Sequence, residues 1–256
     1  MQKHTLFSDN QNSLYEAICF DMDGVVVDTQ VTVTLFWQQL ATEYALTLAQ
    51  EDFDHHIYGC SATYTLATLF PFLSMSQREE VYARLERYEQ HAAYQEIPGA
   101  VALLRQLQAA HLPLALVTSA HRWKVERVLK QLGLEQVFAA QITAHDIARG
   151  KPDPACYVCA AQALGGKHPS RCLVFEDAPS GVKAARAAGM ECCGVRSTDT
   201  AHVLLDAGAS MTIPDLTSVV VAFPPRLATE TGRSPLLHLL IGTERRLPFV
   251  TEWRER

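Results

Sequence analysis

The sequence lacks a long apolar segment near its start. The first residues, MQKHTLFSDNQNSLYEA, contain no apolar run behind a basic stretch, although a signal peptide requires such a run. They also lack the roughly 20 consecutive apolar residues that a membrane helix needs. We therefore expect a cytoplasmic protein with no membrane partner.

An excess of positive charge is also absent, because 22 Lys and Arg stand against 28 Asp and Glu, for a net charge of -6. This balance gives no general attraction toward nucleic acid or anionic membranes. We therefore expect no nucleic-acid partner. A small phosphorylated metabolite, the partner we do expect, would need a local cluster of positive groups or a metal. We further expect a monomer or a weak homodimer.

The cysteines form no pattern typical of disulfides or zinc sites. There are seven, an odd number, and most lie in apolar stretches. Cys156 and Cys159 form one C-x-x-C, but no second pair follows at zinc-site spacing. The surrounding ACYVCAAQAL favours a helix. We therefore expect reduced cysteines that pack in the core.

Short apolar runs alternate with helical patterns along much of the chain. The runs predict buried strands, and several helical patterns end at a glycine, which favours a left-handed C-cap. This alternation predicts an α/β fold with a parallel sheet that is covered on both faces. The strands are expected at 15–20, 113–118, 171–175 and 191–195, and the helices at 100–111, 121–132, 154–164 and 180–188.

One segment interrupts the alternation. Residues 29–97 contain no clear strand, and TLFWQQLATEYAL and SQREEVYARLERYEQHAAY place apolar residues at helical spacing. We expect a helical domain here, inserted into a core formed by 14–28 and 98–222, with a hinge or linker at Ile97, Pro98 and Gly99. Residues 223–256 form a C-terminal extension, a short strand or helix with a charged tail, to which we assign no role.

Polar side chains follow the predicted strands where their carboxyl ends should form one edge of the sheet. Asp21 and Asp23 end the first run, and alternation in an extended backbone puts both side chains on one side. One carboxylate can attack phosphorus, and the other can protonate the leaving oxygen and then deprotonate water. An isolated D-x-D is more often a solvated turn than a catalytic pair.

Three other strand ends carry suitable groups. Glu176 and Asp177 offer the oxygen ligands that magnesium prefers, although Asp177 alone can be the N-cap of the next helix. Lys151 lies between restricting prolines in GKPDP and can stabilise phosphoryl oxygens. The Thr118 hydroxyl can bind a phosphoryl oxygen. Each of the last two, taken alone, can be an ordinary loop or strand-end residue.

These elements occur in one order, and together they resemble the haloacid dehalogenase superfamily. FDMDGVVVDT resembles its first motif, VTS its second, KPDP its third and FEDAPSGVKAARAAGM its fourth, over residues 15–195. The resemblance implies a Rossmann-like parallel-sheet core with an inserted α-helical cap. It points to the subgroup of β-phosphoglucomutases and sugar-phosphate phosphatases, whose C1 cap follows the first motif.

The resemblance also implies a role for each strand-end residue. Asp21 would be the nucleophile and Asp23 the general acid and base. Thr118, Ser119 and Lys151 would bind the phosphoryl group. A Mg²⁺ ion would be held by Asp21, the backbone carbonyl of Asp23, and Asp177, with Glu176 assisting. Relatives that cleave carbon–halogen or phosphonate bonds lack a carboxylate two residues after the nucleophile, so Asp23 favours phosphate esters.

The cap sequence narrows the substrate further. HHIYGCSATYTLATLF resembles sugar- and polyol-phosphate phosphatases, and no basic residue directly follows Gly59, which disfavours a second phosphate. His55, His56 and Tyr58 can reach a sugar hydroxyl or simply pack. A β-phosphoglucomutase is one alternative, although its cap histidine would fall near Val33. A non-catalytic metabolite-binding or interaction protein of the same fold is the other.

Overall fold

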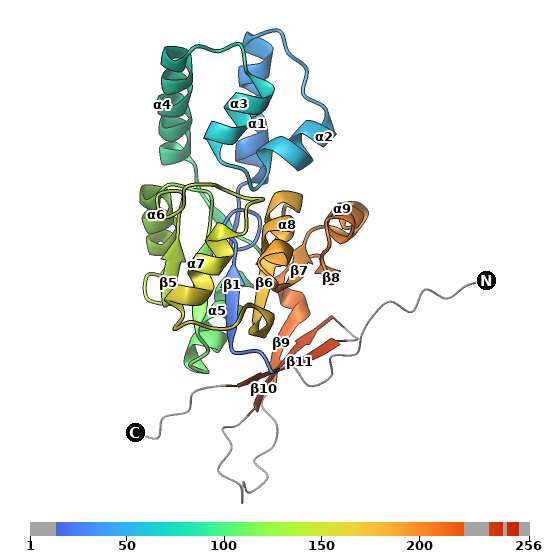
Figure 1. Ribbon diagram of the computed structural model, residues 1–256. Helices are drawn as coiled ribbons and strands as arrows, with labels where there is room; N and C mark the ends of the chain where they lie inside the picture. Colours follow the sequence, from blue (N-terminus) through green and yellow to red (C-terminus); the bar gives the residue numbers. More distant parts are fainter. Residues whose placement is uncertain (1–13, 223–235, 243–244, 251–256) are drawn as a thin grey trace, which may run out of the picture.

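A six-stranded parallel sheet forms the centre of the protein, in the strand order β5-β4-β1-β6-β7-β8 (Figure 1). The computed structural model describes residues 14–222, 236–242 and 245–250. The chain moves outward from β1 to β4 and β5, then returns to the other side of β1. The strands are β1 (Ala17–Phe20), β4 (Leu114–Val117), β5 (Ala140–Ile142), β6 (Cys172–Glu176), β7 (Glu191–Val195) and β8 (Met211–Ile213).

Helices cover both faces of this sheet, as the apolar strands require. Alternate residues of β1 point to opposite sides, so Ile18 and Phe20 join one hydrophobic cluster while Ala17 and Cys19 join the other. This confirms the predicted α/β fold. The first face is covered by α5 (Ala100–Ala109) and α6 (Arg122–Leu132), and the second by α7 (Ala155–Ala163), α8 (Pro179–Ala187) and α9 (His202–Asp206). Short 3-10 turns lie at η2 (Pro169–Arg171), η3 (Thr198–Thr200) and η4 (Leu216–Ser218).

The predicted helical cap is present and has a core of its own. It lies above the carboxyl ends of the strands (Figure 1). Trp37, Leu40 and Phe70 are buried in a cluster separate from those of the sheet. Two short antiparallel strands, β2 (Val27–Asp28) and β3 (Gln95–Glu96), connect cap and core. The cap helices are α1 (Gln30–Glu43), α2 (Gln50–Asp52), the π-helical η1 (Phe53–Ile57), α3 (Ala62–Leu69) and α4 (Met75–His91).

A second, antiparallel sheet lies at the end of the core opposite the cap. It consists of β9 (Val219–Ala222), β10 (Leu236–Ile241) and β11 (Arg245–Val250). Leu239 and Phe249 are fully buried in the same cluster as α5 and α6. The described part of the C-terminal extension is therefore packed into the core. The rest of it, 223–235, 243–244 and 251–256, lies outside the described residues.

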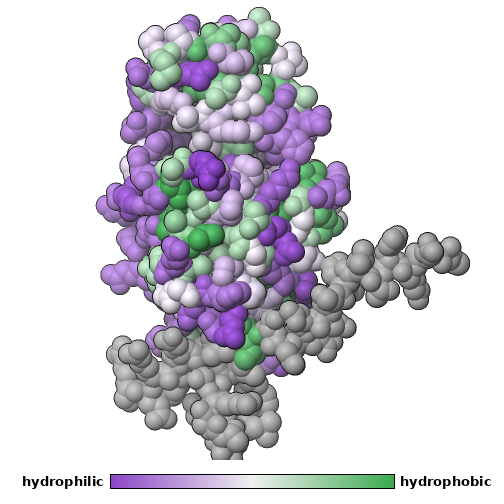
Figure 2. Space-filling model, viewed as in Figure 1, coloured by the Kyte–Doolittle hydropathy of each residue, from purple (hydrophilic) through white to green (hydrophobic). Residues whose placement is uncertain are grey.

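The outer surface carries hydrophilic residues over both cap and core on the face shown in Figure 2. Among the helices described, none combines the length and apolar composition of a membrane span.

Phe249 tests whether the C-terminal sheet belongs to the folding unit. Its ring is completely buried and lies 5.2 Å from the ring of Tyr15. We expect Phe249→Ala to lower the free energy of unfolding by about 3–5 kcal/mol, because a large core cavity remains. Urea unfolding measures this, with Phe72→Ala as the matched control, since Phe72 is 56% exposed. Equal stability of the two variants would contradict the assignment.

Candidate active site

The strand order brings the predicted site residues together. β1 lies between β4 and β6, so their carboxyl ends adjoin, and the chain reverses its direction across the sheet at β1. Asp21 directly follows β1, and its backbone N-H donates to the Phe175 carbonyl at 3.0 Å. Thr118 follows β4, Glu176 ends β6 and Asp177 follows it. The four stand at one edge of the sheet.

Lys151 reaches the same point from the loop after β5. Its side chain is 1% exposed, and its ammonium donates to Oδ1 of Asp21, to Oε1 of Glu176 at 2.5 Å and to the Val117 carbonyl at 3.2 Å. A buried ammonium needs such partners, because burial without them disfavours the charged form. Lys151 therefore fixes one oxygen of Asp21.

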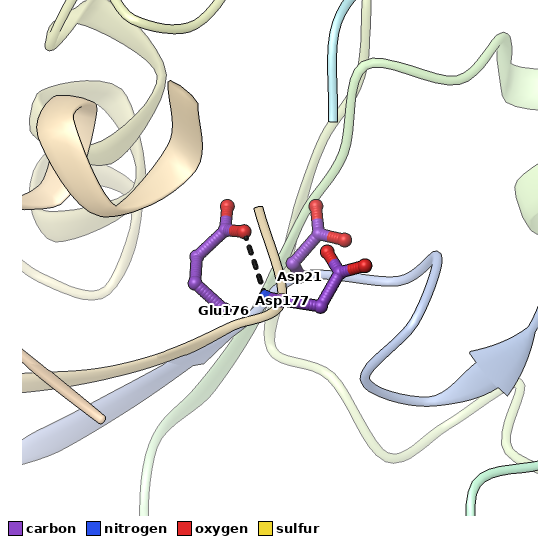
Figure 3. Close-up of side chains that lie close together, drawn as sticks. All are labelled: Asp21, Glu176 and Asp177. Atoms are coloured by element: carbon purple, nitrogen blue, oxygen red, sulfur yellow. Dashed lines mark hydrogen bonds between the residues drawn. The ribbon is translucent and has the colours of Figure 1, made fainter. Parts of the chain in front are cut away.

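Asp21 and Asp177 each have a buried oxygen with no hydrogen-bond partner among the described residues. Within the described residues, Oδ2 of Asp21 and Oδ1 of Asp177 are buried and accept no hydrogen bond. In Figure 3 these two carboxylates face the same space, and oxygens of Asp21, Glu176 and Asp177 lie within 4.8 Å of one another. Buried acceptors without a donor are costly. This set of oxygens fits a hard divalent cation.

The charges in the cluster support the same conclusion. Lys151 pairs with only two of the three carboxyl groups, Asp21 and Glu176, so ionisation of all three would leave a net negative charge in a largely buried place. The pKa of Asp21 is raised to about 8, because burial and the nearby Glu176 raise it by more than Lys151 lowers it. Burial together with Asp21 and Glu176 also raises the pKa of Asp177. A bound cation would remove this conflict.

Glu176 has a different environment from the aspartates. Its Oε1 accepts from Lys151 and from the hydroxyl of Tyr157 at 2.7 Å, and its Oε2 accepts from the backbone N-H groups of Asp177 at 3.1 Å and Ala178 at 3.4 Å. A Cβ on Gly181 would lie 1.8 Å from Oε1 of Glu176, so the glycine of DAPSG leaves room for this carboxylate. Glu176 therefore holds Lys151 and the loop that carries Asp177.

Thr118 and Ser119 differ in what their hydroxyls contact. The Thr118 hydroxyl accepts from the Ala120 N-H at 3.0 Å at the entry to α6. The Ser119 hydroxyl donates to the carbonyl of Gly59 in the cap at 3.0 Å. Gly59 has a φ of +69°, and a Cβ there would lie 2.6 Å from that of Ala178. Gly59 is thus one point where the cap touches the core beside the site.

Asp23 lies in the turn after Asp21 and contacts a residue that the motifs did not indicate. Its Oδ1 accepts from Nζ of Lys124 on α6 at 2.8 Å, and the same ammonium donates to Oε1 of Glu89 on cap helix α4 at 2.6 Å. No sequence signal distinguishes Lys124 from Lys130, the other lysine of its helix. The same holds for Tyr157, which looks like one more apolar residue of α7.

A cavity of about 200 Å³ lies between cap and core, and the site opens into it. Lys151 and Glu176 are not among the described residues that line it. Of the cap residues considered for sugar contacts, Tyr58 lines the cavity, whereas His55 and His56 do not. The core lining includes Asp21, Asp23, Thr118, Ser119, Lys124 and Asp177, and the cap lining includes Val33, Trp37, Tyr58, Tyr82, Glu86 and Glu89.

The chain is similar in sequence to one hydrolase family and to named phosphatases. The model of the haloacid dehalogenase-like hydrolase family matches residues 15–189. Validoxylamine A 7'-phosphate phosphatase from Streptomyces hygroscopicus subsp. limoneus is 34% identical over 80% of this chain and 96% of its own. 2-Deoxyglucose-6-phosphate phosphatase 1 from Saccharomyces cerevisiae is 36% identical over 79% of this chain and 88% of its own.

A solved structure gives the same fold. β-Phosphoglucomutase from Clostridium difficile superposes with a TM-score of 0.67 at 22% identity, over 79% of this chain and 92% of its own. At this identity the likeness describes the fold alone.

Proposed function

Since the chain belongs to the haloacid dehalogenase-like hydrolase family, we propose that it is a phosphatase that hydrolyses a sugar or polyol phosphate through a phosphorylated Asp21. One observation carries this proposal. Asp21 lines the cavity, Lys151 fixes one of its oxygens, and the other oxygen is buried and has no hydrogen-bond partner among the described residues. A carboxylate held in this way is suited to attack phosphorus.

The residues at the site account for both half-reactions. In the first, the free oxygen of Asp21 bonds to phosphorus, the bond to the leaving oxygen breaks, and Asp23 gives that oxygen its proton. In the second, Asp23 takes a proton from a water, whose oxygen bonds to phosphorus as the Asp21–phosphorus bond breaks. The products are the alcohol and inorganic phosphate. Thr118 would bind a phosphoryl oxygen in both steps.

Asp21 and Asp177, which each have a free buried oxygen, would hold the Mg²⁺ ion. The backbone carbonyl of Asp23 would add a third ligand. When bound, the ion would neutralise phosphate charge that otherwise repels the attacking carboxylate. Glu176 would support the site through Lys151 and the Asp177 loop.

The substrate proposal rests on the cavity and on the relatives' names. The two relatives are named for the phosphate esters validoxylamine A 7'-phosphate and 2-deoxyglucose-6-phosphate. In the described lining, Lys124 is the only lysine or arginine, and two carboxylates already pair with it. A second phosphate would meet no free cation there. Val33 lines the cavity where a mutase would carry histidine, which favours hydrolysis over the β-phosphoglucomutase alternative.

A panel of sugar, polyol, nucleotide and glycolate phosphates, assayed with Mg²⁺ for free phosphate, tests this function. We expect turnover of monophosphorylated sugars or polyols above that of p-nitrophenyl phosphate, and little turnover of bisphosphates. Conversion of glucose 1-phosphate to glucose 6-phosphate with a bisphosphate primer would favour the mutase instead. Binding without turnover would favour the non-catalytic alternative.

A further inference from the structure

Lys124 is a buried charge that the proposed reaction does not yet use. Its side chain is 5% exposed, and it lies on α6 among apolar residues. Lysine is rarely buried unless it is paired. Here its ammonium contacts two carboxylates from different parts of the molecule, Asp23 of the core and Glu89 of the cap. It also lies 5.6 Å from the ring centre of Tyr94.

The contact with Lys124 determines the orientation of the Asp23 carboxylate. Among the described residues, Lys124 is the only side-chain hydrogen-bond partner of Asp23, and it holds Oδ1. The second oxygen is left for the cavity that Asp23 lines. A carboxylate with one oxygen fixed keeps the other in a defined direction, which proton transfer to a leaving group requires.

The contact with Glu89 makes this arrangement depend on the cap. Glu89 lies near the end of α4, shortly before β3 returns the chain to the core. If the cap lifts and separates Glu89 from Lys124, Glu89 loses the one ammonium that pairs with it among the described residues, and Lys124 gains freedom to move. Closure of the cap brings Glu89 back to Lys124, so that one largely buried ammonium again donates to both Asp23 and Glu89.

A neighbouring arginine, Arg127, binds the backbone at the end of α4. Arg127, one turn after Lys124, donates to the backbone carbonyls of Glu89 at 2.8 Å and Ala92 at 2.7 Å. It therefore anchors the end of α4 without touching Asp23. Arg127 offers a matched control for any effect of Lys124 that comes from anchoring the cap alone.

We propose that Lys124 is a positioning residue that directs the carboxylate of Asp23 toward the leaving group, and that Glu89 links this positioning to closure of the cap. The inference rests on the proposed function. It adds a pair of residues, one in the core and one in the cap, that the four sequence motifs do not contain.

The test compares kcat/KM for two compounds: the sugar phosphate turned over best in the panel, and p-nitrophenyl phosphate. An alkoxide needs a proton to leave, whereas p-nitrophenolate leaves readily without one. Since kcat/KM ends with departure of the leaving group, hydrolysis of the phosphoenzyme does not enter it. We expect Lys124→Met to lower kcat/KM about 100-fold for the sugar phosphate and less than about tenfold for p-nitrophenyl phosphate.

Three further variants separate positioning from structure. Lys130→Met makes the same change at an exposed site on the same helix and should have no effect. Arg127→Met should change kcat/KM by the same factor for both substrates. Glu89→Gln preserves an acceptor for Lys124, so this variant should fold normally. It should lower kcat/KM for the sugar phosphate by about tenfold and leave kcat/KM for p-nitrophenyl phosphate less affected.

Equal losses for both substrates in Lys124→Met, or no loss, would overturn the positioning role. If Lys124→Met does not fold, Glu89→Gln decides alone, and an equal effect on both substrates would overturn the proposal. Absence of wild-type turnover of both compounds would instead overturn the proposed function, and this inference with it.

Discussion

Asp21→Asn is expected to lower the rate of phosphate release by about 10⁴-fold or more, because the amide cannot form the acyl phosphate. The change keeps the size of the side chain, and an amide oxygen can still accept the hydrogen bond from Lys151. The fold should therefore persist. A malachite-green assay on the preferred ester measures the rate, and circular dichroism checks the fold.

Asp23→Asn is the informative comparison for this variant. It should lose most activity toward alkyl phosphates but keep a larger share of its kcat/KM toward p-nitrophenyl phosphate, whose leaving group needs no proton. Asp21→Asn should lose both activities alike. Phosphate release by Asp21→Asn at the wild-type rate would exclude Asp21 as the nucleophile.

Lys151→Met is expected to affect both activity and stability. The ammonium of Lys151 lies between Asp21 and Glu176, all of them buried. Its removal leaves buried carboxylates without their cation, which costs about 3–5 kcal/mol of unfolding free energy. The rate should fall by about 10²–10³-fold, because Asp21 is no longer held and the phosphoryl oxygens lose a nearby positive charge.

Urea unfolding and steady-state kinetics measure the two effects of Lys151→Met. Lys183→Met, on the exposed face of α8, is the matched control and should stay within about 0.5 kcal/mol of the wild type. Mg²⁺ should recover part of the lost stability in Lys151→Met by binding the unpaired carboxylates. A Lys151→Met protein as stable and as active as the control would contradict the role of the buried cluster.

The strands that carry the site could be predicted because they are fully buried. β1, β4 and β6 read as short apolar runs, and a polar residue directly after each run marks the carboxyl edge of the sheet. The edge strands β5 and β8 could not be found in this way. Each has only three residues, which is too short for a periodic pattern.

The chemistry was predictable where a residue stands at a strand end, and unpredictable where contact depends on tertiary packing. Asp21, Thr118 and Asp177 follow their strands directly. Lys124 and Tyr157 point into the site from helices, where a lysine or tyrosine looks like any other. The burial of β10 and β11 could not be predicted, because PPRLATETGRSP interrupts the pattern before them.

Direct detection of a phosphorylated Asp21 tests the central claim. The wild type is mixed with its preferred ³²P-labelled ester and Mg²⁺, quenched in acid within one turnover, and digested under acidic conditions that preserve acyl phosphates. We predict label on the peptide that contains Asp21, its release by hydroxylamine, and none in Asp21→Asn. Rapid phosphate release in the wild type with label on no peptide, or on a peptide without Asp21, would contradict the account.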